Sequence, residues 1–502
     1  MARLTFLHSN DIHGRLEGLA RLTTLARREQ AHAEAEGRTV FRWDAGDAFD
    51  RRFEDCRLTR GESLAPVLTA SGVTLQTLGN DIGLGYGMTA VTRMARRAGY
   101  TLLAANLRDQ DGAVVEGLRA SVLLNGPDGL SIGVFGLTDP FGGIYGVYGL
   151  NTPDVHDLAR QTVTELRDAG AGLVVLLSHL GLEADHDLAA AVSGIDLIIG
   201  GHSHDLLPEG ERVGKTLVVQ AGEFAEHLGR VDLDVGAAGA ILADRVTVLP
   251  VPADLEPDAE VMEALAALET ELQGIRTEAV GTLAASLHLD HWGESPMAHF
   301  AAQVLRERAG AEVGLISGGA LHTGLQAGEV RRGAVANAVP ATINPMTSRV
   351  TGWRLRMALE RGLDPEVVTY LHRGLRGSPI GVPGLSGVQV TVDPAGRVGE
   401  RVQRVQVNGE ALDLGREYVV AHTDLEPAPY AFLHGEGVTE IASDFTVLLE
   451  DVVRQHFQHR TSVHPDLEPV WLGLRSLPLL GTPQLGGASA LEGKNLRGHD
   501  QV

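Results

Sequence analysis

Cysteine is nearly absent from this sequence, since Cys56 is the single one among 502 residues. The chain therefore holds no internal disulfide, and at this length its core needs none. Aromatic residues make up only 4%, and lysine occurs at positions 215 and 494 alone. No apolar run reaches the length of about 18 residues that a membrane span requires. We expect a soluble, cytoplasmic protein with no targeting segment and no membrane contact.

Positive charge is also scarce, which leaves a formal net charge of −23 at pH 7. Binding to a nucleic-acid polymer depends on clustered cations that meet phosphates, so this charge argues against such a partner. It does not exclude a small phosphorylated substrate, because a bound metal ion can reverse the local field. A hydrophobic content of 44% is typical of a folded globular chain.

The first half of the chain alternates short apolar runs with amphipathic helical stretches, for example Leu16–Arg28 and Ser63–Ala70. This alternation predicts a layered α/β domain. The predicted strands are Leu4–Leu7, Val40–Trp43, Thr74–Leu78, Thr101–Ala104, Ile132–Leu137, Leu173–Leu177 and Leu197–Ile199.

Four segments are predicted along the chain. The α/β domain covers residues 1–252, a helical linker 253–280, a smaller α+β domain 281–475 and a disordered tail 476–502. In the second domain, Asn408-Gly409 between two alternating runs predicts a β-hairpin. In the first, the glycine-rich stretch Gly83–Gly87 predicts a flexible loop.

Residues of the metal-ligand types follow several of the predicted strands. In layered α/β folds, sites form where loops leave the carboxyl ends of strands, so these residues are expected to meet. Their carboxylate, amide and imidazole groups suit two divalent cations such as Mn²⁺, Fe²⁺, Co²⁺ or Zn²⁺. The candidate metal ligands are Asp11, His13, Asp47, Asn80, His179, His202 and His204.

The motifs Asp11-x-His13, Gly46-Asp47, Gly79-Asn80, His179 and Gly201-His202-x-His204 resemble the calcineurin-like metallophosphoesterase pattern. The second half resembles the C-terminal domain of bacterial 5′-nucleotidases. That likeness rests on Glu294-Ser295-Pro296, Ser317-Gly318-Gly319 and Val350-Thr351-Gly352-Trp353. The combination looks like a subgroup of bifunctional metallophosphatase/5′-nucleotidase proteins, and it implies an α-β-β-α layered first domain.

The resemblance also implies how the ligands divide. Asp11, His13, Asp47 and His204 would hold one metal. Asp47, Asn80, His179 and His202 would hold the other, with Asp47 as the bridge. Two such metals can clamp an in-line phosphoryl displacement and generate a hydroxide nucleophile from a bound water.

Asp81 departs from the family pattern, which has a histidine after Gly-Asn. An anionic carboxylate is repelled by a phosphoryl group, so it could donate a proton only if its pKa were raised. Two interpretations remain. Asp81 either points away and leaves the catalysis to the metals and Asn80, or it acts as a protonated general acid.

The predicted substrate contacts depart from the family as well, because the arginine after the glycine turn is missing. The candidates in the second domain are Gly318, Gly319, His322, Tyr430 and Phe432. A glycine turn can offer backbone N–H groups to an anion, and an aromatic ring can stack on a base.

The sequence predicts a metallophosphoesterase that hydrolyses a small phosphoester, most simply a nucleoside 5′-monophosphate. Two alternatives remain: a cyclic-nucleotide or other phosphodiester hydrolase, and a metal-bound nucleotide sensor that has lost turnover.

Overall fold

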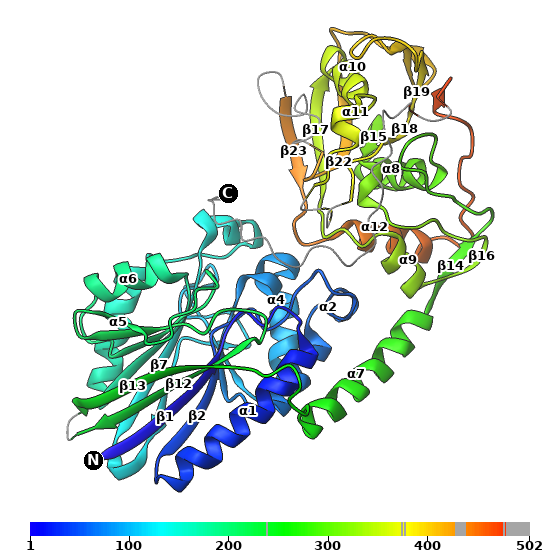
Figure 1. Cartoon of the computed structure of the whole chain (residues 1–502). Helices are drawn as coiled ribbons and strands as arrows, with labels where there is room; N and C mark the ends of the chain where they lie inside the picture. The colour runs from blue at the N-terminus through cyan, green and yellow to red at the C-terminus, as the bar shows by residue number, and fades with distance from the viewer. Residues whose placement is uncertain (237–238, 373–374, 376–377, 427–437, 475–476, 478–502) are drawn as a thin grey trace.

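The computed structural model describes residues 1–236, 239–372, 375, 378–426, 438–474 and 477. The predicted tail, residues 476–502, lies outside these residues except for Leu477. Figure 1 shows two bodies joined along the long helix α7 (Ala259–Thr277).

The first sheet has seven strands in the order β13-β12-β1-β2-β3-β4-β5. β1 pairs in parallel with β2 and antiparallel with β12, so it lies in the interior of the sheet. The strands are β1 Ala2–Ser9, β2 Thr39–Asp44, β3 Leu75–Thr77, β4 Thr101–Leu103, β5 Leu118–Arg119, β12 His227–Val235 and β13 Ile241–Pro250.

The second sheet has six strands in the order β10-β11-β9-β8-β7-β6. β7, β8 and β9 run parallel, and their near-continuous apolar sequences are buried on both faces. The strands are β6 Ser121–Asn125, β7 Ser131–Thr138, β8 Leu173–His179, β9 Leu197–Ile199, β10 Glu211–Val213 and β11 Thr216–Val219.

Apolar side chains from both sheets, including Phe6, Trp43 and Val175, form a core between them. Separate apolar layers cover the outer faces of the two sheets. One layer packs helices α1 to α4 against the first sheet, and the other packs α5 and α6 against the second. The prediction of an α-β-β-α layered domain is confirmed (Figure 1). The helices are α1 Leu16–Ala35, α2 Glu54–Thr59, α3 Ala65–Ala70, α4 Asn80–Arg97, α5 Val155–Asp168 and α6 Leu182–Ala191.

Helix α7 lies in the predicted linker segment 253–280, and it packs against the first body. Asp258 caps its start by accepting from the backbone N–H groups of residues 260 and 261. Val261, Leu268 and Leu272 are buried in the same apolar layer as α1 and α3. The exact domain boundaries stay a prediction.

The second body has a five-stranded sheet, β18-β15-β22-β17-β23, a four-stranded sheet, β21-β20-β19-β24, and the pair β14-β16. Its strands are β14 Ala279–Leu283, β15 Val313–Ile316, β16 Gly328–Arg331, β17 Pro345–Thr351, β18 Gly384–Ser386, β19 Val388–Val392, β20 Val402–Val407, β21 Glu410–Ala411, β22 Glu417–Thr423, β23 Val438–Ser443 and β24 Trp471–Leu472. Its helices are α8 Pro296–Ala309, α9 Arg332–Ala338, α10 Gly352–Arg361, α11 Pro365–Val368 and α12 Leu449–Gln458.

Two local predictions have opposite outcomes. The hairpin at Asn408-Gly409 is confirmed, because both residues have positive φ (50° and 86°) between the antiparallel strands β20 and β21. The loop predicted for Gly83–Gly87 is wrong, since these residues lie within α4, with a local break at Gly87 (φ 71°). Gly83 and Gly85 are buried there against Tyr145 and Arg51, so their small size serves packing.

The two bodies contact each other through polar groups. The Arg60 guanidinium of the first body lies 2.7 Å from Asp451 in α12. Arg332 of α9 donates to the carbonyl of Leu58 (2.7 Å), and the Tyr148 hydroxyl donates to that of Phe445 (3.0 Å). The second body is thereby held beside the loops that follow the first sheet.

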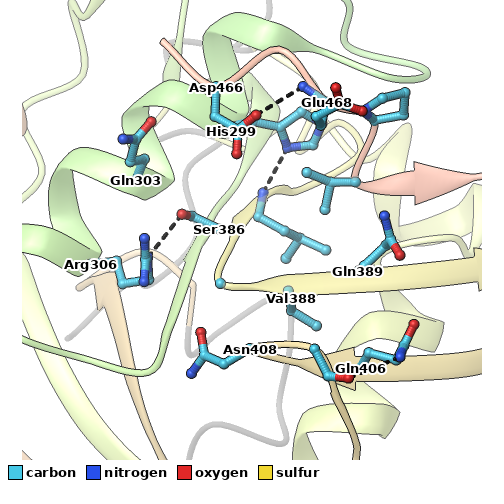
Figure 2. Close-up of a pocket in the computed structure, with 15 residues that line it drawn as sticks. His299, Gln303, Arg306, Ser386, Val388, Gln389, Gln406, Asn408, Asp466 and Glu468 are labelled. Carbon is cyan, nitrogen blue, oxygen red and sulfur yellow. Dashed lines mark hydrogen bonds between the residues drawn. The ribbon is translucent and has the colours of Figure 1, made fainter. Parts of the chain in front are cut away.

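A cavity of about 380 Å³ lies between α8 and the strands β18–β20 of the second body (Figure 2). Two of its lining side chains have partners within the protein: Arg306 donates to Ser386 (3.0 Å), and His299 Nδ1 accepts from the backbone N–H of Leu385 (3.0 Å). Among the residues that the structure describes, no helix is long and apolar enough to cross a bilayer.

Candidate metal centre

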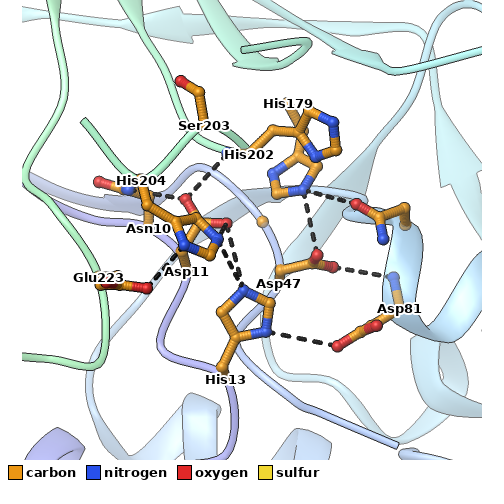
Figure 3. Close-up of polar contacts among 12 residues, drawn as sticks. Asn10, Asp11, His13, Asp47, Asp81, His179, His202, Ser203, His204 and Glu223 are labelled. Atoms are coloured by element: carbon orange, nitrogen blue, oxygen red, sulfur yellow. Dashed lines mark hydrogen bonds and ion pairs between the residues drawn. The ribbon is translucent and has the colours of Figure 1, made fainter. Parts of the chain in front are cut away.

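Loops that leave the carboxyl ends of strands in both sheets bring the candidate ligands together (Figure 3). Asp11 and His13 follow β1, Asp47 follows β2, and Asn80 is the first residue of α4. In the second sheet His179 ends β8, while His202 and His204 follow β9. Because the parallel strands all end at this edge, residues from remote parts of the sequence converge there.

The backbone is strained where these ligands lie. Asp11, His13, Asp47, His202 and His204 all have positive φ, from 46° to 78°. Such conformations are uncommon for residues other than glycine, and they persist only where surrounding contacts fix them. The fixing contacts include the Asp11 N–H to Gly46 and the His13 N–H to Asp47, each 2.9 Å long. Strain of this kind clusters at functional sites.

The first group consists of Asp11, His13 and His204. Asp11 is fully buried, and its Oδ2 accepts from Asn10 Nδ2 (2.8 Å) and from the His202 N–H (2.9 Å). Its Oδ1 has no hydrogen-bond partner and lies 3.6 Å from His13 Nε2 and 3.5 Å from His204 Nε2. A buried carboxylate oxygen left without a donor and facing two imidazole nitrogens fits a cation between them.

The second group is formed by Asp47, His179 and Asn80. His179 Nε2 lies 3.2 Å from Asp47 Oδ2 and 3.3 Å from Asn80 Oδ1. The other oxygen of Asp47 accepts from the backbone N–H of Asp81 (3.0 Å). The ligand atoms of Asp11, Asp47 and His179 all lie within 4.8 Å of one another, and so do those of the first group. Asp11 therefore takes part in both clusters.

His202 lies differently from the other candidates. Its Nε2 is 3.2 Å from Asp139 Oδ2, and its ring packs against that of His179 with centroids 5.1 Å apart. A metal ligand from this ring would therefore have to be Nδ1. His202 is the one histidine candidate that is absent from the clusters formed by the described residues.

Three of the four candidate histidines have one ring nitrogen within 3.2 Å of an oxygen acceptor, whereas His13 Nδ1 lies 3.4 Å from Asp81. His179 Nδ1 lies 2.7 Å from the Ala45 carbonyl, and His204 Nδ1 lies 2.6 Å from Glu223. Acceptors of this kind fix the tautomer and orientation of a ligating histidine. Sequence reasoning missed Glu223, which no local pattern marks. It also missed Asn10 and Asp139, which directly follow β1 and β7 and which the strand-end rule could have found.

The electrostatics of the cluster favour positive charge. Burial opposes the charged form of His13, but Asp11 and Asp81 outweigh it and raise its pKa to about 10. Burial likewise opposes the charge on His179, and Asp47 raises the pKa to about 9. The pKa of Asp11 is lowered, because the neighbouring histidines overcome its burial. The same field would hold a divalent cation, which displaces those protons on binding.

Three glycines make room for the ligands. A Cβ on Gly46 would lie 2.6 Å from His179 Nδ1, and one on Gly201 would lie 2.7 Å from the Ala45 carbonyl. A Cβ on Gly79 would overlap the backbone nitrogen and carboxylate of Asp47. The glycine in each motif thus permits close approach to a ligand or to its support.

One of the two interpretations was that Asp81 points away from the centre. The structure differs, because the Asp81 side chain turns toward the centre. Its Oδ2 lies 3.4 Å from His13 Nδ1, and its ligand atom clusters with those of His13 and Asp47. Burial and the charge of Asp47 raise the pKa of Asp81, which His13 opposes.

The predicted substrate residues of the second body are only partly described. Tyr430 and Phe432 lie outside the described residues. Gly318 and Gly319 are buried in a tight turn, and the N–H groups of residues 319 to 322 all donate to carbonyls of the protein. These groups are therefore not free to bind an anion. His322 is exposed and lines a cavity of about 620 Å³ together with His288 and Trp292.

Comparisons with known proteins bear on both bodies. Residues 276–431 match the family model described as 5′-nucleotidase, C-terminal domain. An uncharacterised metallophosphoesterase of Bacillus subtilis (strain 168), YunD, is 25% identical over 84% of this chain and 92% of its own length. The trifunctional nucleotide phosphoesterase YfkN of the same organism is 27% identical over 82% of this chain and 31% of its length.

Solved structures share the two-body fold. A 5′-nucleotidase precursor from Thermus thermophilus matches with a TM-score of 0.53 and 22% identity, over 94% of this chain and 99% of that one. The NAD nucleotidase of Haemophilus influenzae matches with a TM-score of 0.59 and 15% identity, over 94% and 98%. The predicted resemblance to metallophosphoesterases with a 5′-nucleotidase C-terminal domain is confirmed, and so is the predicted enzyme class, a phosphoester hydrolase.

Proposed function

We propose that this protein uses two divalent cations to hydrolyse a small phosphomonoester, with a nucleoside 5′-monophosphate as the substrate class. The observation that carries the proposal is the pair of clusters that share Asp11, one completed by His13 and the half-buried His204 and the other by the buried Asp47 and His179. Two cations held there would activate a water and neutralise charge on the phosphoryl oxygens.

The residues of the chain have distinct roles in this proposal. Asp11, His13 and His204 hold one cation, while His179, Asn80 and His202 hold the other. Asp47 lies between them, since its carboxylate contacts His179 and belongs to clusters with both Asp11 and His13. The carboxylates of Asp11 and Asp47 are buried, which keeps bulk water from competing for them and strengthens their hold on the cations.

The nucleotide class is supported by the second body and by the relatives. Residues 276–431 match the C-terminal domain of 5′-nucleotidases, and one relative is a nucleotide phosphoesterase by name. The exposed His322, which lines a cavity of the second body with His288 and Trp292, remains a proposed substrate contact in place of the family's missing arginine. Tyr430 and Phe432 remain proposed stacking partners for a base.

The test is phosphate release from a panel of esters with Mn²⁺, Co²⁺, Zn²⁺ or Mg²⁺. The panel contains nucleoside 5′-monophosphates, p-nitrophenyl phosphate and bis-p-nitrophenyl phosphate. We expect nucleoside monophosphates to give the highest kcat/KM. Asp47→Ala should abolish turnover, whereas the exposed Asp111→Ala serves as a matched control and should retain it.

Three results would contradict the proposal. Full activity of Asp47→Ala would exclude the metal centre as the catalytic site. A preference for the diester would favour a phosphodiesterase. Nucleotide binding by calorimetry with phosphate release at background would favour a sensor.

A further inference from the structure

Asp81 lies between the two proposed metal ligands Asp47 and His13. It is the second residue of α4, directly after Asn80, and its side chain is 15% exposed. Its backbone N–H donates to Asp47 Oδ1 (3.0 Å), and its carboxylate turns toward His13, with Oδ2 3.4 Å from Nδ1. The other carboxylate oxygen lies 4.0 Å from Arg51 Nε. Asp81 thus faces protein groups on both sides.

The ring of His13 has two different environments. Its Nε2 faces Asp11 and His204 at 3.6 and 3.1 Å, which is the side of the proposed cation. Its Nδ1 faces the carboxylates of Asp81 at 3.4 Å and Asp50 at 3.9 Å. Asp50 is already bound by Arg52, with contacts of 2.6 to 2.7 Å. Asp81 is therefore the carboxylate nearer to His13 Nδ1. Its own arginine partner, Arg51, also lies farther away than Arg52 lies from Asp50.

A similar arrangement with shorter distances, 2.6 to 3.2 Å against 3.4 Å, occurs at the other candidate histidines. His179 has the Ala45 carbonyl behind it, His204 has Glu223, and His202 has Asp139. In each case one ring nitrogen lies on an oxygen acceptor and the other is left for the metal side. An acceptor at Nδ1 favours the tautomer whose Nε2 lone pair is available, and it fixes the ring plane.

We propose that Asp81 is a positioning residue that holds the metal ligand His13 through Nδ1, and that it is not the group that protonates the leaving group. The inference rests on the metal site of the proposed function, though not on its substrate. It assigns a role to the residue that replaces the histidine expected after Gly-Asn. It also means that the side chain at position 81 does not serve as a general acid in this centre.

The test measures metal binding in the full chain after metal depletion. Mn²⁺ titrations, by calorimetry and by electron paramagnetic resonance of free Mn²⁺, give the affinity of each site. Asp81→Ala removes the acceptor, and we expect it to weaken one site about 10- to 100-fold. Asp81→Asn retains an amide oxygen that can still accept from Nδ1, so we expect a smaller loss.

Two controls keep the result interpretable. Thermal unfolding of the metal-free variants shows whether they fold like the wild type, and Asp81→Asn serves if Asp81→Ala does not fold. Where the enzyme turns over, the pH profile of kcat for Asp81→Asn should keep the shape of the wild-type profile.

Unchanged Mn²⁺ affinity in both variants would overturn the inference. Loss of an acidic-to-neutral limb from the pH profile, with affinity unchanged, would instead make Asp81 a general acid. If the wild type binds two Mn²⁺ ions but hydrolyses no ester, the proposed function fails, while weaker binding by Asp81→Ala still supports the positioning role.

Discussion

Replacing Gly201 by alanine should disturb the centre without removing any ligand group, because the new Cβ would press on the Ala45 carbonyl and on the side chains of Asp11 and His179. A Cβ there would lie 2.7 Å from the Ala45 carbonyl oxygen, and 3.1 Å from both Asp11 Oδ2 and His179 Nδ1. Real Cβ atoms essentially never approach closer than 3.0 Å, and ordinary contact begins at 3.4 Å. Since the nearest atom belongs to the backbone, the neighbours must move by about 0.3 to 0.7 Å.

That shift falls on the support of one ligand and on two ligands themselves. The Ala45 carbonyl accepts from His179 Nδ1, so moving it turns the imidazole away from Asp47. A misplacement of 1 Å in a catalytic site costs up to about 100-fold in rate. We therefore expect Gly201→Ala to lower kcat/KM about tenfold, which corresponds to about 1.4 kcal/mol of barrier.

The assay compares three glycine-to-alanine variants by kcat/KM for p-nitrophenyl phosphate, by Mn²⁺ affinity and by thermal unfolding. Gly79→Ala should lose more than Gly201→Ala, because its Cβ would overlap Asp47. Gly274→Ala is the matched control, since nothing lies within 4 Å and the residue is inside helix α7. It should retain full activity and gain up to about 1 kcal/mol of stability. If Gly201→Ala stays within twofold of the wild type in both rate and affinity, the close packing around these ligands is not what positions them.

Three further predictions follow from the same geometry. Glu223→Ala should weaken Mn²⁺ binding about tenfold, because the acceptor 2.6 Å from His204 Nδ1 is lost; unchanged affinity would remove Glu223 from the centre. If Asp81 donates no proton, then among simple esters that carry no nucleoside, kcat/KM should fall steeply as the leaving-group pKa rises from p-nitrophenol to an alkyl alcohol, and a flat dependence would require another proton donor. Burial raises the pKa of Glu450 from 4.5 to about 7, so its contribution to the free energy of unfolding is present below the unfolded pKa and is lost as pH rises through 7. Denaturant titrations from pH 4 to 8 should therefore show that the free energy of unfolding of the wild type falls relative to that of Glu450→Gln. If the free energies of the two proteins change in parallel with pH, the raised pKa of Glu450 is contradicted.

The candidate ligands could be predicted from the sequence because each lies at or just after a strand or at a helix start. That position carries local information: an apolar run followed by Asp, Asn or His. The same rule did not identify the supporting roles of Asn10 and Glu223. These roles depend on contacts with residues distant in the sequence, Asn10 with Ala221 at 211 positions and Glu223 with His204 at 19. Asn10 immediately precedes a ligand, yet nothing in the local pattern separates a supporting amide from a loop residue.

Glycine was the hardest residue to interpret from sequence. The run Gly83–Gly87 resembles a loop by composition, but it lies in α4, where close packing against Tyr145 and Arg51 requires small residues. Conversely, Gly318 and Gly319 resemble an anion-binding turn, yet a Cβ at either would collide with backbone carbonyls of residues 382 and 379. In both cases the cause is tertiary packing, which local composition does not encode.

The contact between the two bodies could not be predicted either. Arg60 meets Asp451 and Tyr148 meets the carbonyl of Phe445, pairs that are separated by 391 and 297 positions. Single charged or polar residues at such separations leave no recognisable pattern.

Counting bound metal and released phosphate in the same samples is the decisive measurement for a two-cation phosphoesterase centre. We expect two Mn²⁺ ions per wild-type chain, fewer in Asp47→Ala, and phosphate release from a nucleoside 5′-monophosphate that rises with occupancy of the second site. Phosphate release at full rate from a metal-depleted chain, or from a chain that binds a single ion, would contradict it.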